Sequence, residues 1–111
     1  MAPLCTVKDI PDGGSEGFYT DTSDGRNLYM VLRRGDEVFV YKNVCPHTGM
    51  PLDFQPGRFL TADGGLIQCS THGAKFLIET GVCISGPCMG DRLTSVRTEI
   101  RSGEIYLTGS G

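Results

Sequence analysis

The chain is short, rich in glycine and mildly acidic. It has 111 residues, of which 16 are Gly and none is Trp, and its formal net charge is -3. We expect one domain spanning residues 1–111, because this length is usual for a single domain. The Lys and Arg residues, ten in all, are scattered without a basic run, so we expect neither nucleic acid nor a membrane as a partner.

The N-terminus carries no pattern of a targeting segment. Residues 1–8 lack the basic head and the apolar core of a secretory signal, and no run of the chain approaches the length of a membrane span. We therefore expect a cytoplasmic protein. In a reducing compartment, the five Cys are expected to be metal ligands or buried thiols rather than disulfides.

The sequence predicts an all-β fold, because short alternating or β-branched runs recur between turn residues and helical spacing is hard to find. Gly35-Asp36 and Ser102-Gly103 lie between such runs and predict two hairpins. We expect these hairpins to form an antiparallel β-sandwich base, with edge strands added near the N-terminus. The candidate strands, in chain order, are residues 5–10, 16–21, 28–34, 37–42, 66–69, 75–79, 93–101 and 104–107.

The segment between the two hairpins has a different composition. Residues 44–90 contain both His, four of the five Cys and four Pro, and their strands look short. Small loop-rich folds often include a metal centre, because ligands that are organised only in the folded state make metal binding part of the folding free energy. We interpret residues 44–90 as a compact subdomain presented on the β base.

Two mixed Cys and His knuckles carry the chemistry of this segment. Cys45 and His47 form the first knuckle, and Cys69 and His72 form the second. Four N and S ligands suffice for tetrahedral zinc or for a two-iron cluster. Zinc sites usually pair Cys with Cys and His with His, whereas each knuckle here offers one thiolate and one imidazole. This pattern favours a cluster of two inequivalent irons, with a structural zinc module that binds other proteins as the alternative.

Residues 44–90 resemble a Rieske ferredoxin. The family's first cluster loop is matched by Cys45-Pro46-His47-Thr48-Gly49 followed by Leu52, and its second by Cys69-Ser70-Thr71-His72-Gly73-Ala74-Lys75-Phe76. The proline-containing loop that covers the cluster in the family is matched by Gly86-Pro87. The resemblance implies a Rieske-like fold in which residues 44–90 are a cluster-binding subdomain, with one [2Fe-2S] cluster per chain.

The resemblance also implies roles for the four ligands. Cys45 and Cys69 would bind the inner iron, and His47 and His72 would bind the outer, solvent-facing iron through imidazole nitrogen. The protein would then be a ferredoxin that takes electrons from a flavin-dependent reductase and passes them to an oxygenase. It would not be an enzyme itself, because a mononuclear-iron oxygenase needs two more His and a carboxylate, and both His of the chain are already used.

Departures from the family pattern predict a low reduction potential. Rieske centres span about −150 to +300 mV, and high-potential members carry a disulfide between the loops and two hydroxyl groups that donate to cluster sulfur. The corresponding positions here hold Met50 and Thr71 for the disulfide, and Ala74 and Phe76 for the hydroxyls. We expect a value in the lower half of the range, because fewer donors leave more cluster charge uncompensated. Gly49 and Gly73 are expected to take positive φ and to bring N–H groups close to the sulfurs.

Two questions stay open in the sequence. The same ligands would suit a cluster-bearing small subunit of a larger oxidoreductase such as nitrite reductase. In addition, Cys83 and Cys88 lie close together in the segment that would cover the cluster. We expect them to be buried thiols, with extra ligands or a redox disulfide as alternatives.

Overall fold

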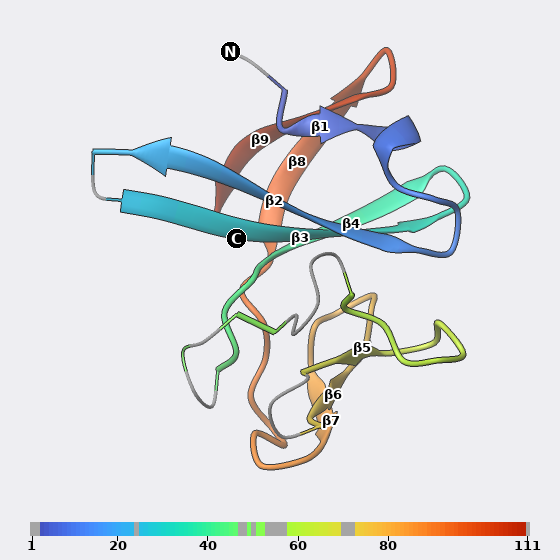
Figure 1. The fold of residues 1–111 in the computed structure, drawn as a ribbon, viewed down its shortest axis with the longest axis vertical. Helices are drawn as coiled ribbons and strands as arrows, with labels where there is room; N and C mark the ends of the chain where they lie inside the picture. Colours follow the sequence, from blue (N-terminus) through green and yellow to red (C-terminus); the bar gives the residue numbers. More distant parts are fainter. Residues whose placement is uncertain are drawn as a thin grey trace.

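The computed structural model describes residues 3–23, 25–46, 49, 51–52, 58–69 and 73–110. Within these ranges the strands form three antiparallel sheets of three strands each, with one short 3-10 helix and no α-helix (Figure 1). The all-β fold expected from the sequence is confirmed. No helix in the described ranges is long and apolar enough to cross a membrane.

The first sheet brings the two ends of the chain together. β1 (Cys5–Thr6) pairs with β9 (Glu104–Ser110), which also pairs with β8 (Val96–Arg101). Ser102 and Gly103 form the β8–β9 turn with φ of 51° and 79°. Positive φ at both residues is the usual geometry of a two-residue hairpin turn. The second expected hairpin is confirmed, although its first strand begins later than residue 93.

The N-terminal strand prediction is only partly correct. β1 covers Cys5–Thr6, and the chain then turns into a 3-10 helix at Val7–Asp9. The Thr6 backbone N–H donates to Asp9 Oδ2 at 2.9 Å. This local acceptor competes with strand pairing, which is the usual effect of Asp near a chain turn.

The second sheet contains the first expected hairpin, which is confirmed. Its order is β2 (Ser15–Thr22), β3 (Gly25–Arg34) and β4 (Glu37–Lys42). Gly35 begins the β3–β4 turn with φ of 59°. A bridge between Tyr41 and Ser95 connects this sheet to the segment that leads into β8.

The third sheet is small and belongs to the segment between the hairpins. It contains β5 (Ile67–Gln68), β6 (Lys75–Phe76) and β7 (Cys83–Ser85) in that order. Figure 1 shows it below the second sheet, at the end of the molecule away from the β8–β9 turn. Two-residue strands supply few ladder hydrogen bonds, so the loops between them depend on other contacts.

Alternate side chains of β3 face two different hydrophobic cores, as the period of two along a strand requires. Tyr29 and Val31 belong to the core between the first and second sheets, and Met30 and Leu32 to the core beneath the second sheet. We call these the base core and the site core. The base core comprises Cys5, Ile10, Tyr29, Val31, Val40 and Ile105. The site core comprises Met30, Leu32, Tyr41, Cys45, Leu52, Phe59, Ile67, Cys69, Ala74, Phe76, Ile78, Cys83, Cys88 and Leu93.

Candidate metal centre

The two predicted ligand loops place their cysteines in the same core. Cys45 follows β4 and Cys69 follows β5, with exposed fractions of 1% and 0%. Both are free thiols and both belong to the site core. The two predicted histidine ligands, His47 and His72, lie outside the described residues.

Each of these cysteines begins the same kind of turn. The Gly49 N–H donates to the carbonyl oxygen of Cys45 at 2.8 Å, and the Gly73 N–H donates to that of Cys69 at 2.9 Å. Gly49 and Gly73 have φ of 73° and 70°, a region that side chains with a Cβ rarely adopt. The expected positive φ is therefore confirmed at both glycines. Both N–H groups donate to cysteine carbonyls, and the approach of backbone N–H groups to the cluster sulfurs stays a prediction.

The first loop is closed by the side chain of Asn43. This residue is 5% exposed, and its Oδ1 accepts a hydrogen bond from the Leu52 backbone N–H at 2.7 Å. Its own backbone N–H donates to the Leu28 carbonyl on β3 at 2.9 Å. The Asn43 side chain therefore joins the two ends of the loop that carries Cys45, and the Asn43 backbone N–H attaches the start of that loop to the second sheet.

The second loop is held by strand pairing on one side and by the segment after β7 on the other. The Cys69 N–H donates to the Ala74 carbonyl at 2.8 Å. A Cβ added to Gly86 would lie only 2.7 Å from the Ala74 Cα, and Gly86 has φ of 101°. Only glycine allows this close approach. Gly86 therefore lies directly against Ala74 at the end of the second ligand loop, and we call residues 86–90 the cover turn.

The positions expected to lack hydroxyl donors are both in the site core. Ala74 is 1% exposed and Phe76 is fully buried. Both side chains are apolar, so neither can donate a hydrogen bond to a cluster sulfur.

Two polar contacts connect the base to the segment that carries the ligands. The Tyr41 hydroxyl on β4 donates to the Ile78 carbonyl at 2.5 Å, and Arg34 on β3 pairs with Glu79. Burial, with a smaller contribution from Glu79, raises the pKa of Tyr41 to about 12. Tyr41 therefore stays neutral and remains a donor over the physiological range of pH.

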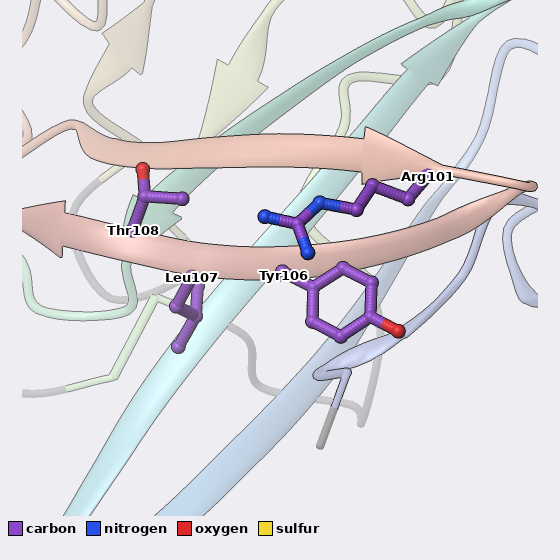
Figure 2. Close-up of a pocket in the computed structure, with 4 residues that line it drawn as sticks. All are labelled: Arg101, Tyr106, Leu107 and Thr108. Carbon is purple, nitrogen blue, oxygen red and sulfur yellow. The ribbon is translucent and has the colours of Figure 1, made fainter. Parts of the chain in front are cut away.

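A pocket at the opposite end of the molecule does not contribute to this site. Figure 2 shows Arg101, Tyr106, Leu107 and Thr108 around a hollow of about 380 Å³ on the β8–β9 hairpin. The Arg101 guanidinium is paired with Glu99 at 2.8 Å. The described residues that line this pocket include no cysteine, histidine or carboxylate that could bind a metal.

The described residues fit the metal group that the sequence predicts. Two buried sulfurs stand at the start of two matched turns, and sulfur together with imidazole nitrogen is the donor set of a mixed-ligand two-iron cluster. Among the described residues, which do not include the two histidines, no group of three or more His, Cys, Asp and Glu side chains comes together that could hold a metal ion.

Comparison with known protein families also points to a two-iron cluster. The model of the Rieske [2Fe-2S] domain matches residues 1–100. The chain belongs to the Rieske [2Fe-2S] domain family. The Rieske resemblance and the [2Fe-2S] cofactor expected from the sequence are thereby confirmed, and the alternative of a structural zinc module is wrong.

Curated Rieske relatives are ferredoxins. The chain is 33% identical over 79 residues to ferredoxin CarAc of Metapseudomonas resinovorans, covering 71% of this chain and 68% of that protein. It is 27% identical over 103 residues to the 3-phenylpropionate/cinnamic acid dioxygenase ferredoxin subunit of Escherichia coli strain K12, covering 93% of this chain and 88% of that protein.

Solved Rieske structures support the fold. The Sphingomonas yanoikuyae B1 ferredoxin matches with a TM-score of 0.74 and 27% identity over 96% of this chain and 95% of that one. A ferredoxin solved in complex with the oxygenase of carbazole 1,9a-dioxygenase matches with a TM-score of 0.72 and 25% identity, over 96% and 90% of the two chains. The Rieske protein described here is therefore a one-electron carrier and not a catalyst in its own right.

Proposed function

We propose that this protein carries electrons from a flavin-dependent reductase to an oxygenase, with its cluster held by Cys45, His47, Cys69 and His72. The observation that supports this most directly is the pair of matched turns. Each begins at a buried cysteine and closes on a glycine in left-handed conformation. Each also includes one histidine in its sequence, so the two loops offer the same two donors in the same order.

The four side chains divide into two kinds of ligand. Cys45 and Cys69 would supply the two thiolate ligands, and both are buried in the site core. His47 and His72 would supply the two imidazole ligands of the cluster. When bound, the cluster supplies a group that takes up and gives up one electron. The chain keeps water from the sulfurs and holds the loops at fixed positions.

The proposed partners follow from the relatives. One related ferredoxin was solved in complex with the oxygenase of carbazole 1,9a-dioxygenase, and another is a subunit of a phenylpropionate dioxygenase. Val44 precedes the first ligand and is exposed, as is Met89 in the cover turn. These apolar side chains next to the ligand loops suit a transient docking surface, where an exposed apolar group excludes water from the contact.

We further propose one domain over residues 1–111, with residues 44–90 as the cluster-binding subdomain, and a cytoplasmic location. All five cysteines are free, as a reducing compartment would keep them. The low reduction potential proposed from the sequence is supported by the apolar side chains of Ala74 and Phe76, which leave the cluster sulfurs without these two hydroxyl donors.

The ligand proposal is tested by spectroscopy of single variants. We expect purified protein with equal iron and acid-labile sulfide, and a Rieske-type electron paramagnetic resonance signal after reduction. His47→Ala should lose this signal, and His72→Cys should change it to that of a cluster with more thiolate ligands. Cys5→Ser is the matched control, because Cys5 is a buried cysteine of the base core. An unchanged signal in either histidine variant would show that the ligand assignment is wrong.

The electron-transfer proposal needs a separate assay. Protein reduced by a flavin-dependent reductase should be reoxidised by a dioxygenase of the kind found in the relatives, at a rate that rises with ferredoxin concentration. Replacing the exposed Val44 by Asp should slow this step and leave the signal unchanged. If the protein exchanges electrons with no reductase and no dioxygenase of this kind, the result would favour the small subunit of a larger oxidoreductase and would contradict the role of a free ferredoxin.

A further inference from the structure

Two cysteines outside the ligand set meet beneath the cover turn. Cys83 lies on β7 and Cys88 lies in the turn that follows, and their Sγ atoms are 3.0 Å apart. Both are free thiols, with exposed fractions of 2% and 3%. Nothing in the proposed electron transfer uses either of them.

The backbone already holds the two cysteines in this position. The Cys83 N–H donates to the Asp91 carbonyl at 2.8 Å, and the Asp91 N–H donates to the Cys88 carbonyl at 2.9 Å. The Cys88 thiol donates to Cys83 Sγ, and the Cys83 thiol donates to the Ser85 carbonyl at 3.2 Å. A disulfide bond is about 2.05 Å long, so closure needs a movement of only about 1 Å between the sulfurs.

We propose that Cys83 and Cys88 form a reversible disulfide by exchange with a low-molecular-weight disulfide such as oxidised glutathione. The thiolate of one cysteine attacks a sulfur of the small disulfide and releases one small thiol. The second cysteine then displaces the other small thiol from the mixed disulfide. In total, two protein thiols lose two protons and two electrons, and one small disulfide is reduced to two thiols.

The disulfide would act on the second ligand loop. Gly86 lies between the two cysteines in sequence and contacts Ala74, which pairs with Cys69. Covalent closure between residues 83 and 88 removes conformations in which the cover turn moves away from that loop. This regulatory role depends on the proposed function, because it acts through the cluster that the loop holds.

Both cysteines of the pair are thiols in the structure. Burial, followed by the hydrogen bond to Cys83, raises the pKa of Cys88 to about 12. A thiol with a raised pKa exchanges slowly at neutral pH, because the thiolate is the reactive form.

The thiol state can be measured directly. Holoprotein is equilibrated without oxygen in glutathione buffers of different oxidised-to-reduced ratio, quenched with acid, alkylated and digested with trypsin. Cleavage after Lys75 and Arg92 gives a peptide that contains Cys83 and Cys88 and no other cysteine. We expect two alkyl groups on this peptide in reducing buffer. In oxidising buffer we expect none, and the disulfide-containing peptide should be lighter by two hydrogen atoms than the unalkylated dithiol peptide. Full alkylation at every ratio would overturn the proposal.

The variants Cys83→Ser and Cys88→Ser serve as controls. Each should keep one cysteine that alkylates or carries a single glutathione, and neither should give the lighter peptide. A lighter peptide in either variant would show that the mass change has another origin and would overturn the pairing.

The effect on the site has its own measurement. With the disulfide closed, release of iron to a chelator should be slowed by about threefold or more, as expected when a constraint removes open conformations. In a variant that combines Cys83→Ser and Cys88→Ser, the release rate should not depend on the glutathione ratio. Equal rates in the two states of the unaltered protein would contradict the proposed action on the ligand loop. The peptide measurement needs no iron, so its failure is distinct from failure of the ligand assignment.

Discussion

Gly86 and Gly90 offer a matched test of how the cover turn protects the cluster loops. Both have φ near 100°, at 101° for Gly86 and 95° for Gly90. A Cβ added at Gly86 would lie 2.7 Å from the Ala74 Cα, whereas one added at Gly90 meets nothing within 4 Å. The two alanine variants therefore share the backbone penalty and differ in the contact with the second ligand loop.

The size of the difference follows from these two contributions. Placing alanine in this backbone region costs about 1–3 kcal/mol at either position. The forced contact with the Ala74 backbone adds about 1–3 kcal/mol for Gly86→Ala alone, which is the usual cost of overpacking. Backbone atoms cannot rotate away as a flexible side chain can. The cover turn must therefore move away from the second loop.

The assay measures both the free energy of unfolding and the exposure of the cluster. Urea unfolding should show Gly86→Ala less stable than Gly90→Ala by about 1–3 kcal/mol. Iron release to a chelator, followed by the loss of visible absorbance, should be at least about fivefold faster in Gly86→Ala, because about 1 kcal/mol corresponds to about a factor of five. Equal release rates in the two variants would refute the idea that the Gly86 contact keeps the cover turn closed.

Two further predictions concern the contacts that hold the ligand loops to the base. Asn43→Leu should lower the free energy of unfolding by about 1–3 kcal/mol, because the buried Leu52 N–H loses its acceptor, while Asn43→Asp should keep most of the stability in urea unfolding. Tyr41→Phe should cost about 0.5–1.5 kcal/mol at neutral pH. Since folding raises the pKa of Tyr41 from 10.0 to about 12, its contribution is present below pH 10 and is lost as the pH rises toward 12. Urea unfolding at several pH values should therefore show that Tyr41→Phe loses less stability above pH 10 than the unaltered protein does.

Much of the base could be predicted because its strands follow simple local rules. The turns at Gly35 and at Ser102-Gly103 carry residues that tolerate left-handed backbone, and the runs on either side are apolar and β-branched. Thr6 and Asp9 show where these rules fail. A capping contact between them replaced strand pairing with a 3-10 helix, and short-range hydrogen bonds of this kind leave little trace in a hydrophobic pattern.

The site was predictable in its chemistry and less so in its geometry. The mixed knuckles and the glycines that follow them were visible in the sequence, and the positive φ at Gly49 and Gly73 followed from residue type. The carbonyl partners of the Gly49 and Gly73 N–H groups could not be predicted, because these hydrogen bonds depend on how far each turn closes. The contact between Cys83 and Cys88 was also open, since it depends on β7 pairing with β6 and on the cover turn folding back.

The second sheet explains how such short strands can hold a cluster. Its central strand β3 is buried on both faces, with Val31 in the base core and Met30 in the site core, and each is fully buried. The other residues of the base core include Cys5, Ile10 and Ile105 from the two ends of the chain, which lie far from the ligand loops in the sequence. Because one rigid strand contributes to both cores, the ligand loops are built on a surface that the base already fixes. The first loop is attached to that surface through the hydrogen bond from the Asn43 backbone N–H to the Leu28 carbonyl on β3, and the second loop is held against the cover turn by the contact between Ala74 and Gly86.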